Sequence, residues 1–146
     1  MTKTMLTANF SLEEFSCPCC GFNNVQHELV RALQDLRDRL HLPVRVHSGC
    51  RCPKHNKAVG GAHNSNHLHG AAADISVEAV PTMRVLAVAE LVKPFKGFGY
   101  SAEYLHVDVD GDRPARTYWL YTPQAVTIER SAWVEYMEFL KRDLTD

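Results

Sequence analysis

The sequence predicts an α+β fold, in which a mostly antiparallel sheet packs against helices. Apolar residues recur with helical spacing early in the chain, and short segments with alternating apolar residues become more frequent later. No internal repeat, low-complexity segment or flexible linker divides the 146 residues. We therefore expect a single domain that spans residues 1–146.

Three helical segments and one strand are predicted before residue 60. The stretch "SLEE" at residues 11–14 has the pattern of a capping box and should open one short helical turn. Residues 26–41 carry apolar side chains at helical spacing, and Pro43 ends that helix. Residues 44–48 alternate like a strand, and residues 53–59 should form a short helix that begins with proline.

Strands dominate the rest of the chain. Alternation predicts them over residues 71–77, 98–101, 104–110 and 115–121. The stretch "DGDR" at residues 110–113 predicts a hairpin turn that joins the last two strands. Helices are predicted over residues 82–93 and 131–142, and the last helix should cover the sheet.

Composition limits the classes of function. The formal net charge is only −1, and no basic stripe suits nucleic acid or an anionic membrane. The N-terminal residues lack the apolar run of a secretory signal, and no apolar segment approaches the length of a membrane span. We expect a monomer made in the cytoplasm without a signal peptide, with neither a nucleic-acid nor a membrane partner.

Histidine and acidic residues gather in a pattern that suggests a metal site. Alternation along residues 104–110 places Tyr104, His106, Asp108 and Asp110 on one face. The apolar residues between them form the core face. His106 and Asp108 should therefore lie on the open face of the sheet.

Asp74 lies between apolar neighbours, where an unpaired charge is costly. If its strand adjoins residues 104–110, Asp74 and His106 could share one ion, with His67 added from the preceding loop. Two imidazoles and one carboxylate leave a fourth position open, as in catalytic zinc sites. Glu103 and Asp108 are the candidate general bases. Alternatively, a histidine in a polar loop is only a solvated side chain, as expected for His27 and His41, and Asp74 accepts backbone hydrogen bonds.

Two stretches together resemble a known family. "SGCRCPKHNKAVGGAHNSNHLHGAAADIS", followed by "YLHVDV", is similar to the M15 zinc peptidases of the D-Ala-D-Ala carboxypeptidase group, especially the short branch of bacteriophages and bacteria. The resemblance runs from "ANFSLEEFSC" to "RPARTYW" and implies a hedgehog-like peptidase fold. Its pattern, S-x-H-x-x-G-x-A-x-D with a later H-x-D, corresponds to Ser65, His67, Gly70, Ala72, Asp74, His106 and Asp108.

The resemblance assigns roles to several of these residues. It implies that His67, Asp74 and His106 hold one catalytic Zn²⁺. It also implies that Arg51 grips a substrate carboxylate, with a hydrogen bond from Ser65 in support. A salt bridge from Arg51 to Asp74 or a bond to a loop carbonyl is the alternative.

The resemblance also bears on proton transfer. Relatives carry an acidic residue three positions before the last ligand, which makes Glu103 the expected general base. Many relatives have histidine where this chain has Tyr104, which could donate a hydrogen bond to the oxyanion or form an aromatic wall. Asp108 is expected to orient a zinc ligand from behind.

Five cysteines form two groups, "CPCC" and "CRC". We expect Cys17, Cys20, Cys50 and Cys52 to hold a second, structural Zn²⁺, to form a disulfide, or to remain buried thiols. In each case they would join the N-terminal segment to the chain beside the active site, without taking part in catalysis.

These inferences converge on one function. We expect a zinc-dependent peptidase that hydrolyses the stem peptides of bacterial peptidoglycan, as a D-Ala-D-Ala carboxypeptidase or an endolysin-like endopeptidase. It would act at the cell wall or periplasm after release from the cytoplasm. The alternative is a zinc-binding module without turnover, or a phage structural component of the same fold.

Overall fold

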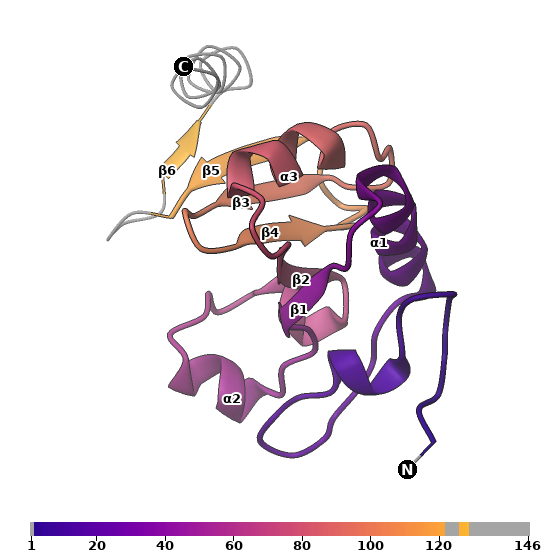
Figure 1. Ribbon diagram of the computed structural model, residues 1–146. Coiled ribbons are helices and arrows are strands. Elements are labelled where there is room, and N and C mark those ends of the chain that lie inside the picture. The colour runs from indigo at the N-terminus through magenta and orange to yellow at the C-terminus, as the bar shows by residue number, and fades with distance from the viewer. Residues whose placement is uncertain (1, 122–125, 129–146) are drawn as a thin grey trace.

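One six-stranded sheet organises the chain (Figure 1). The computed structural model describes residues 2–121 and 126–128. In chain order the elements are η1 (Leu12–Phe15), α1 (His27–Leu40), β1 (Arg45–Ser48), α2 (Pro53–Ala58), η2 (Asn66–His69), β2 (Ala72–Ser76), α3 (Thr82–Ala89), β3 (Gly97–Tyr100), β4 (Leu105–Asp108), β5 (Thr117–Leu120) and β6 (Val126–Ile128). The predicted α+β fold is confirmed. The predicted helix over residues 131–142 lies outside the described residues.

The N-terminal elements follow the sequence signals closely. Ser11 and Glu14 form the predicted capping box at the start of η1. Helix α1 ends where His41 adopts a left-handed φ of 56° and its N–H bonds to the Arg37 carbonyl. Pro53 occupies the first turn of α2, as predicted.

The hydrophobic core lies on one face of the sheet. Helix α1 packs against α3, and α3 packs against β3 and β4 (Figure 1). Both helices and the central strands contribute fully buried apolar side chains to the core, among them Leu29, Leu33, Leu36, Leu86, Phe98 and Leu105. Helix α2 stands apart from this core, beyond the β1 end of the sheet (Figure 1). The loops around α2 therefore do not contribute to this core and can form a functional site.

The order of the strands is β1-β2-β4-β3-β5-β6. All neighbours are antiparallel except β3 and β5, which run parallel. The prediction that residues 110–113 form a hairpin turn between paired strands is therefore wrong. Both edges of β4 are already taken, by β2 and β3, so β5 adds to the free edge of β3 instead.

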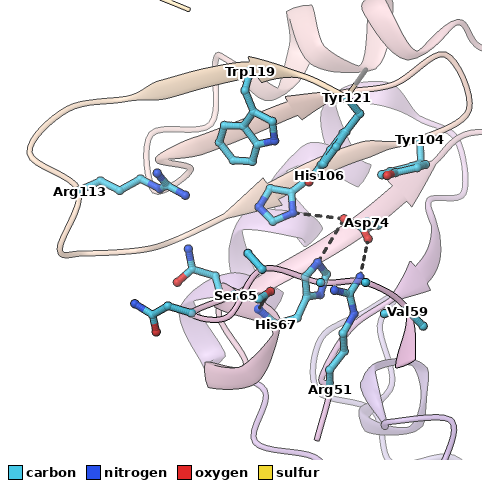
Figure 2. A pocket seen from close by; sticks show the side chains of 15 residues that line it. Arg51, Val59, Ser65, His67, Asp74, Tyr104, His106, Arg113, Trp119 and Tyr121 are labelled. Atoms are coloured by element: carbon cyan, nitrogen blue, oxygen red, sulfur yellow. Dashed lines mark hydrogen bonds and ion pairs between the residues drawn. The ribbon is translucent and has the colours of Figure 1, made fainter. Parts of the chain in front are cut away.

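Strand β4 is buried on both faces, which corrects a second prediction. Leu105 and Val107 face the core as expected, but His106 and Asp108 are also buried, at 5% and 0% exposure. The expected open face is covered by side chains that the chain brings in later, among them Trp119 and Arg113 (Figure 2).

Helix α3 ends at Ala89 rather than at the predicted residue 93. Arg116, just before β5, reaches back to this end. Its guanidinium donates hydrogen bonds to the carbonyls of Glu90, Val92 and Phe95, at 2.6, 2.9 and 3.1 Å. The arginine thus binds three carbonyl groups of the segment that follows the helix.

Among the described residues, the helices are all too short or too polar to traverse a bilayer.

Arg116→Ala should lower the free energy of unfolding by about 2–3 kcal/mol, because it leaves three carbonyl groups without their charged donor. The matched control is Arg39→Ala, which removes an exposed ion pair to Asp35 and should cost less than about 0.5 kcal/mol. Urea denaturation followed by circular dichroism measures both values. Equal effects of the two variants would contradict this account of Arg116.

Candidate metal centre

Three side chains from separate elements converge at one point beside the sheet. His67 comes from η2, Asp74 from β2 and His106 from β4. His67 Nε2 lies 3.3 Å from Asp74 Oδ1, and His106 Nδ1 lies 3.2 Å from the same oxygen. Figure 2 shows both imidazole rings directed at this carboxylate. The structure thus brings together the three residues that the sequence indicated as metal ligands.

Backbone structure sets this convergence. Strands β2 and β4 pair with Asp74 opposite His106, as the sequence required for a shared ion. Ser65 caps η2 and its Oγ accepts a hydrogen bond from the His67 N–H at 3.2 Å. Gly70 then reverses the chain with φ 67°, and a Cβ there would collide with the Asn24 carbonyl. A glycine is required here on both conformational and steric grounds.

The outer nitrogen of each imidazole is held by an acceptor. His67 Nδ1 donates to the Gly49 carbonyl at 2.7 Å, and His106 Nε2 donates to Asp108 Oδ2 at 2.9 Å. These bonds fix the rings so that the opposite nitrogen of each faces Asp74. Histidine ligands of metal sites are oriented in the same way.

A buried cation would satisfy atoms that otherwise lack partners. Asp74 Oδ1 and His106 Nδ1 are both buried, and neither has a hydrogen-bond partner among the residues that the structure describes. An anionic oxygen and a nitrogen that are buried without partners are costly. Two imidazoles and a carboxylate form a donor set typical of zinc. The residues present therefore fit a divalent metal ion of this kind.

Without a metal, electrostatics favour a proton at this site. Burial would raise the pKa of Asp74, but the adjacent imidazoles of His106 and His67 outweigh this effect and hold the pKa well below its usual range. Burial would lower the pKa of His106, but Asp108 and Asp74 outweigh it and raise the pKa to about 9. Metal binding at such a site displaces a proton.

Asp108 supports the site from behind His106. Its carboxylate is fully buried and accepts hydrogen bonds from Arg113 Nε at 3.1 Å and Nη2 at 3.0 Å, besides that from His106. Gly97 lies opposite in β3, where a Cβ would collide with the carboxylate. Asp108 is therefore positioned to orient His106, which is the role expected for it.

The three residues open onto a pocket of about 540 Å³. Arg51, Ser65 and Tyr104, the expected substrate-binding residues, all line it. Arg51 also forms the salt bridge to Asp74 that was the alternative, with Nη2 at 3.2 Å from Oδ2. Its other nitrogens donate to Ser48 Oγ and Asn56 Oδ1. Arg51 therefore holds the second oxygen of Asp74 and contributes to the pocket wall (Figure 2).

The structure places Glu103 outside this pocket. Glu103 is exposed in the turn between β3 and β4, and it lines a separate hollow beside β2 and α3. Among the described residues that line the main pocket, Asp74 is the sole acid. The adjacent residue, Tyr104, does line the pocket. The role of Glu103 as general base stays a prediction.

Sequence reasoning missed three residues that cover the site. The ring of Trp119 lies 5.0 Å from that of His106, and the Arg113 guanidinium lies 5.2 Å from the Trp119 ring. Tyr121 completes this wall (Figure 2). A Cβ at Gly99 would lie 2.6 Å from Trp119 Nε1, so glycine lets the indole lie across β3. Alternation along "YWLY", residues 118–121, could have indicated two of these three residues. Tyr118 is buried in the core, whereas Trp119 and Tyr121 lie on the other face and line the pocket.

The cysteines assemble differently from the expected set. Cys17, Cys20 and Cys52 come together as predicted, but Cys19 joins them in place of Cys50. Strand β1 ends at Ser48, so Cys50 and Cys52 lie in the segment between this strand and α2. The Cys50 N–H bonds to the Phe15 carbonyl at 2.8 Å, and its side chain is buried at 1% exposure.

Comparison with known proteins agrees with this geometry. The model of the Peptidase M15 family matches residues 8–110, more than half of the chain, and the match includes all three candidate ligands. No curated protein matches the chain. M15 peptidases in general depend on zinc, so the match and the His67–Asp74–His106 group together indicate a zinc peptidase. The chain belongs to the peptidase M15 family.

Proposed function

We propose that the protein is a zinc-dependent peptidase that hydrolyses peptide bonds in the stem peptides of bacterial peptidoglycan. It would do so as a D-Ala-D-Ala carboxypeptidase or as an endolysin-like endopeptidase. The observation that carries the proposal is the buried His67–Asp74–His106 group, which opens onto a pocket and has two polar atoms without hydrogen-bond partners in the described part of the chain. The family match supports a peptidase reaction.

Residues of this chain would hold and orient the ion. His67 and His106 present one nitrogen each, because the Gly49 carbonyl and Asp108 engage the other. Asp74 presents Oδ1 while Arg51 binds Oδ2. The chemistry that zinc supplies in such a site is polarisation of a carbonyl oxygen and activation of water.

The walls of the pocket suit a short peptide with a free carboxylate. Two guanidinium groups, those of Arg51 and Arg113, line it; both are already paired with a carboxylate, and their remaining N–H groups can donate hydrogen bonds to a carboxylate of the substrate. Trp119 and Tyr121 form an apolar wall on the β5 side (Figure 2). Stem peptides combine small side chains with carboxylate groups, which is the chemistry that this surface would bind.

Glu103 is the proposed general base, and Tyr104 the proposed hydrogen-bond donor. Burial raises the pKa of Tyr104, so its phenol keeps its proton near neutral pH and can donate to a developing oxyanion. Glu103 precedes Tyr104 in the turn before β4, and a change of its side-chain direction would be needed to face the pocket. The enzyme would act at the cell wall or periplasm after release.

The position of Glu103 also favours a second candidate function. In the described pocket no carboxylate other than Asp74 is present to take a proton. A zinc-binding module without turnover, or a phage structural component of the same fold, would need no such group. The two candidates differ in whether the zinc-loaded protein releases products from peptidoglycan.

The zinc-loaded protein should release small peptides or D-alanine from purified peptidoglycan. His67→Ala should lower this activity by more than about 100-fold, since loss of a residue that only orients a ligand already costs about 10–100-fold. The matched control is His69→Ala, because His69 belongs to the same helical turn but is exposed outside the ligand group. Chromatography and mass spectrometry of the released products provide the measurement. No release from any peptidoglycan type would support the module without turnover.

Glu103→Gln should lower kcat by about 10²–10⁴-fold and leave the zinc content unchanged, because it removes a proton acceptor and no ligand. Asp108→Asn should instead weaken zinc affinity or activity by about 10–100-fold. Glu78→Gln, an exposed glutamate after β2, serves as the control and should behave as wild type. Normal turnover by Glu103→Gln would show that another group accepts the proton.

A further inference from the structure

We propose that Cys17, Cys19, Cys20 and Cys52 form a second metal site, a structural zinc ion bound by four thiolates and separate from the His67–Asp74–His106 group. The four sulfur atoms come from two segments, the loop after η1 and the start of α2. The inference does not depend on peptidase activity.

The sulfur positions fit a tetrahedral ion. The Sγ atom of Cys19 lies 3.6 Å from that of Cys17 and 3.3 Å from that of Cys52, and Cys17 and Cys52 are 3.8 Å apart. All four sulfur atoms lie within 4.8 Å of one another. Zinc–sulfur bonds of about 2.3 Å in a tetrahedron place sulfur atoms about 3.8 Å apart. The cluster therefore needs little rearrangement to enclose zinc.

Backbone hydrogen bonds hold the N-terminal loop in this arrangement. The Cys17 N–H bonds to the Phe22 carbonyl at 2.8 Å, and the Gly21 N–H bonds to the Cys17 carbonyl at 2.8 Å. Gly21 adopts a left-handed φ of 79°, which lets the loop close on itself. The loop places three sulfur atoms beside Cys52 without help from an element of regular structure.

The donor set selects the kind of ion. Four sulfur donors suit zinc or iron and do not suit magnesium, calcium or manganese, which prefer oxygen. We choose zinc because tetrahedral four-cysteine sites are a standard structural form of this metal. A disulfide would join only two of the four sulfur atoms, whereas the geometry brings all four together.

Such an ion would fix one wall of the pocket. Cys52 is the N-cap of α2 and follows Arg51, which contacts Asp74. The chain just after α2, residues 59–62, lines the pocket. A zinc ion at the cysteines would tie this segment to the N-terminal loop, as a cross-link between residues far apart in the sequence.

Zinc content per chain tests the proposal directly. Protein purified under reducing conditions with zinc should contain about two zinc ions per chain by elemental analysis, one for each site. Cys19→Ala should lose one ion, and His67→Ala should lose the other. Cys50→Ala is the matched control, because Cys50 is a buried cysteine beside Cys52 that lies outside the cluster, and it should retain both ions.

Cobalt substitution tests the ligands in protein that keeps all its cysteines. His67→Ala protein loaded with Co²⁺ should show sulfur-to-metal charge-transfer absorption, and Cys19→Ala should lose that absorption. This measurement decides the question even if Cys19→Ala fails to fold, because the His67→Ala protein retains all four thiols.

Several results would overturn the proposal. One is equal zinc content in wild type and Cys19→Ala, with Cys19→Ala folded by circular dichroism. Others are iron in place of zinc, or a thiol titration that finds only about one free cysteine in protein purified without reductant and no sulfur–cobalt absorption after reduction. Because metal content and spectra are measured, these failures are distinct from an absence of peptidase activity.

Discussion

The pairing of β2 with β4 is the constraint on which the rest of the site depends. It sets Asp74 opposite His106 within the sheet, with both side chains buried. A shift of one residue would turn Asp74 to the other face and Ala73 or Ile75 toward the site, so the register must be specified strongly. The apolar neighbours provide that specification, since Ile75 is fully buried against the helices. The core that stabilises the fold therefore also sets the spacing of the candidate ligands.

Buried charge is balanced along a line of contacts through the site. Arg51 forms an ion pair with Asp74, and Asp74 also forms an ion pair with His106. On its other side, His106 donates a hydrogen bond to Asp108, which also accepts a hydrogen bond from Arg113. Each carboxylate contacts a guanidinium on one side and an imidazole on the other. Breaking such a network at one member leaves an unpaired buried charge, which costs far more than the loss of a surface ion pair.

The segment between β1 and α2 connects the two candidate metal sites. Gly49 accepts the hydrogen bond that orients His67, Arg51 supports Asp74, and Cys52 belongs to the sulfur cluster. A Cβ at Gly49 would lie 2.8 Å from the Phe15 backbone, so this segment packs directly on η1. The arrangement explains why an irregular stretch can position a ligand-orienting carbonyl accurately: it is held between the N-terminal loop and the sheet.

The sequence by itself determined most of the helices and strands and indicated the three candidate ligands, because periodicity and the spacing of polar residues are local properties of the chain. It offered the adjacency of the strands that carry Asp74 and His106 only as a condition, which the structure meets. Only the tertiary structure decided the insertion of β3 between β4 and β5, the cover that Trp119 provides and the exchange of Cys50 for Cys19. Strand order depends on which edges earlier strands have already taken. The direction of a side chain in an irregular loop depends on backbone hydrogen bonds to distant residues. No local sequence pattern predicts strand order or the direction of such a side chain.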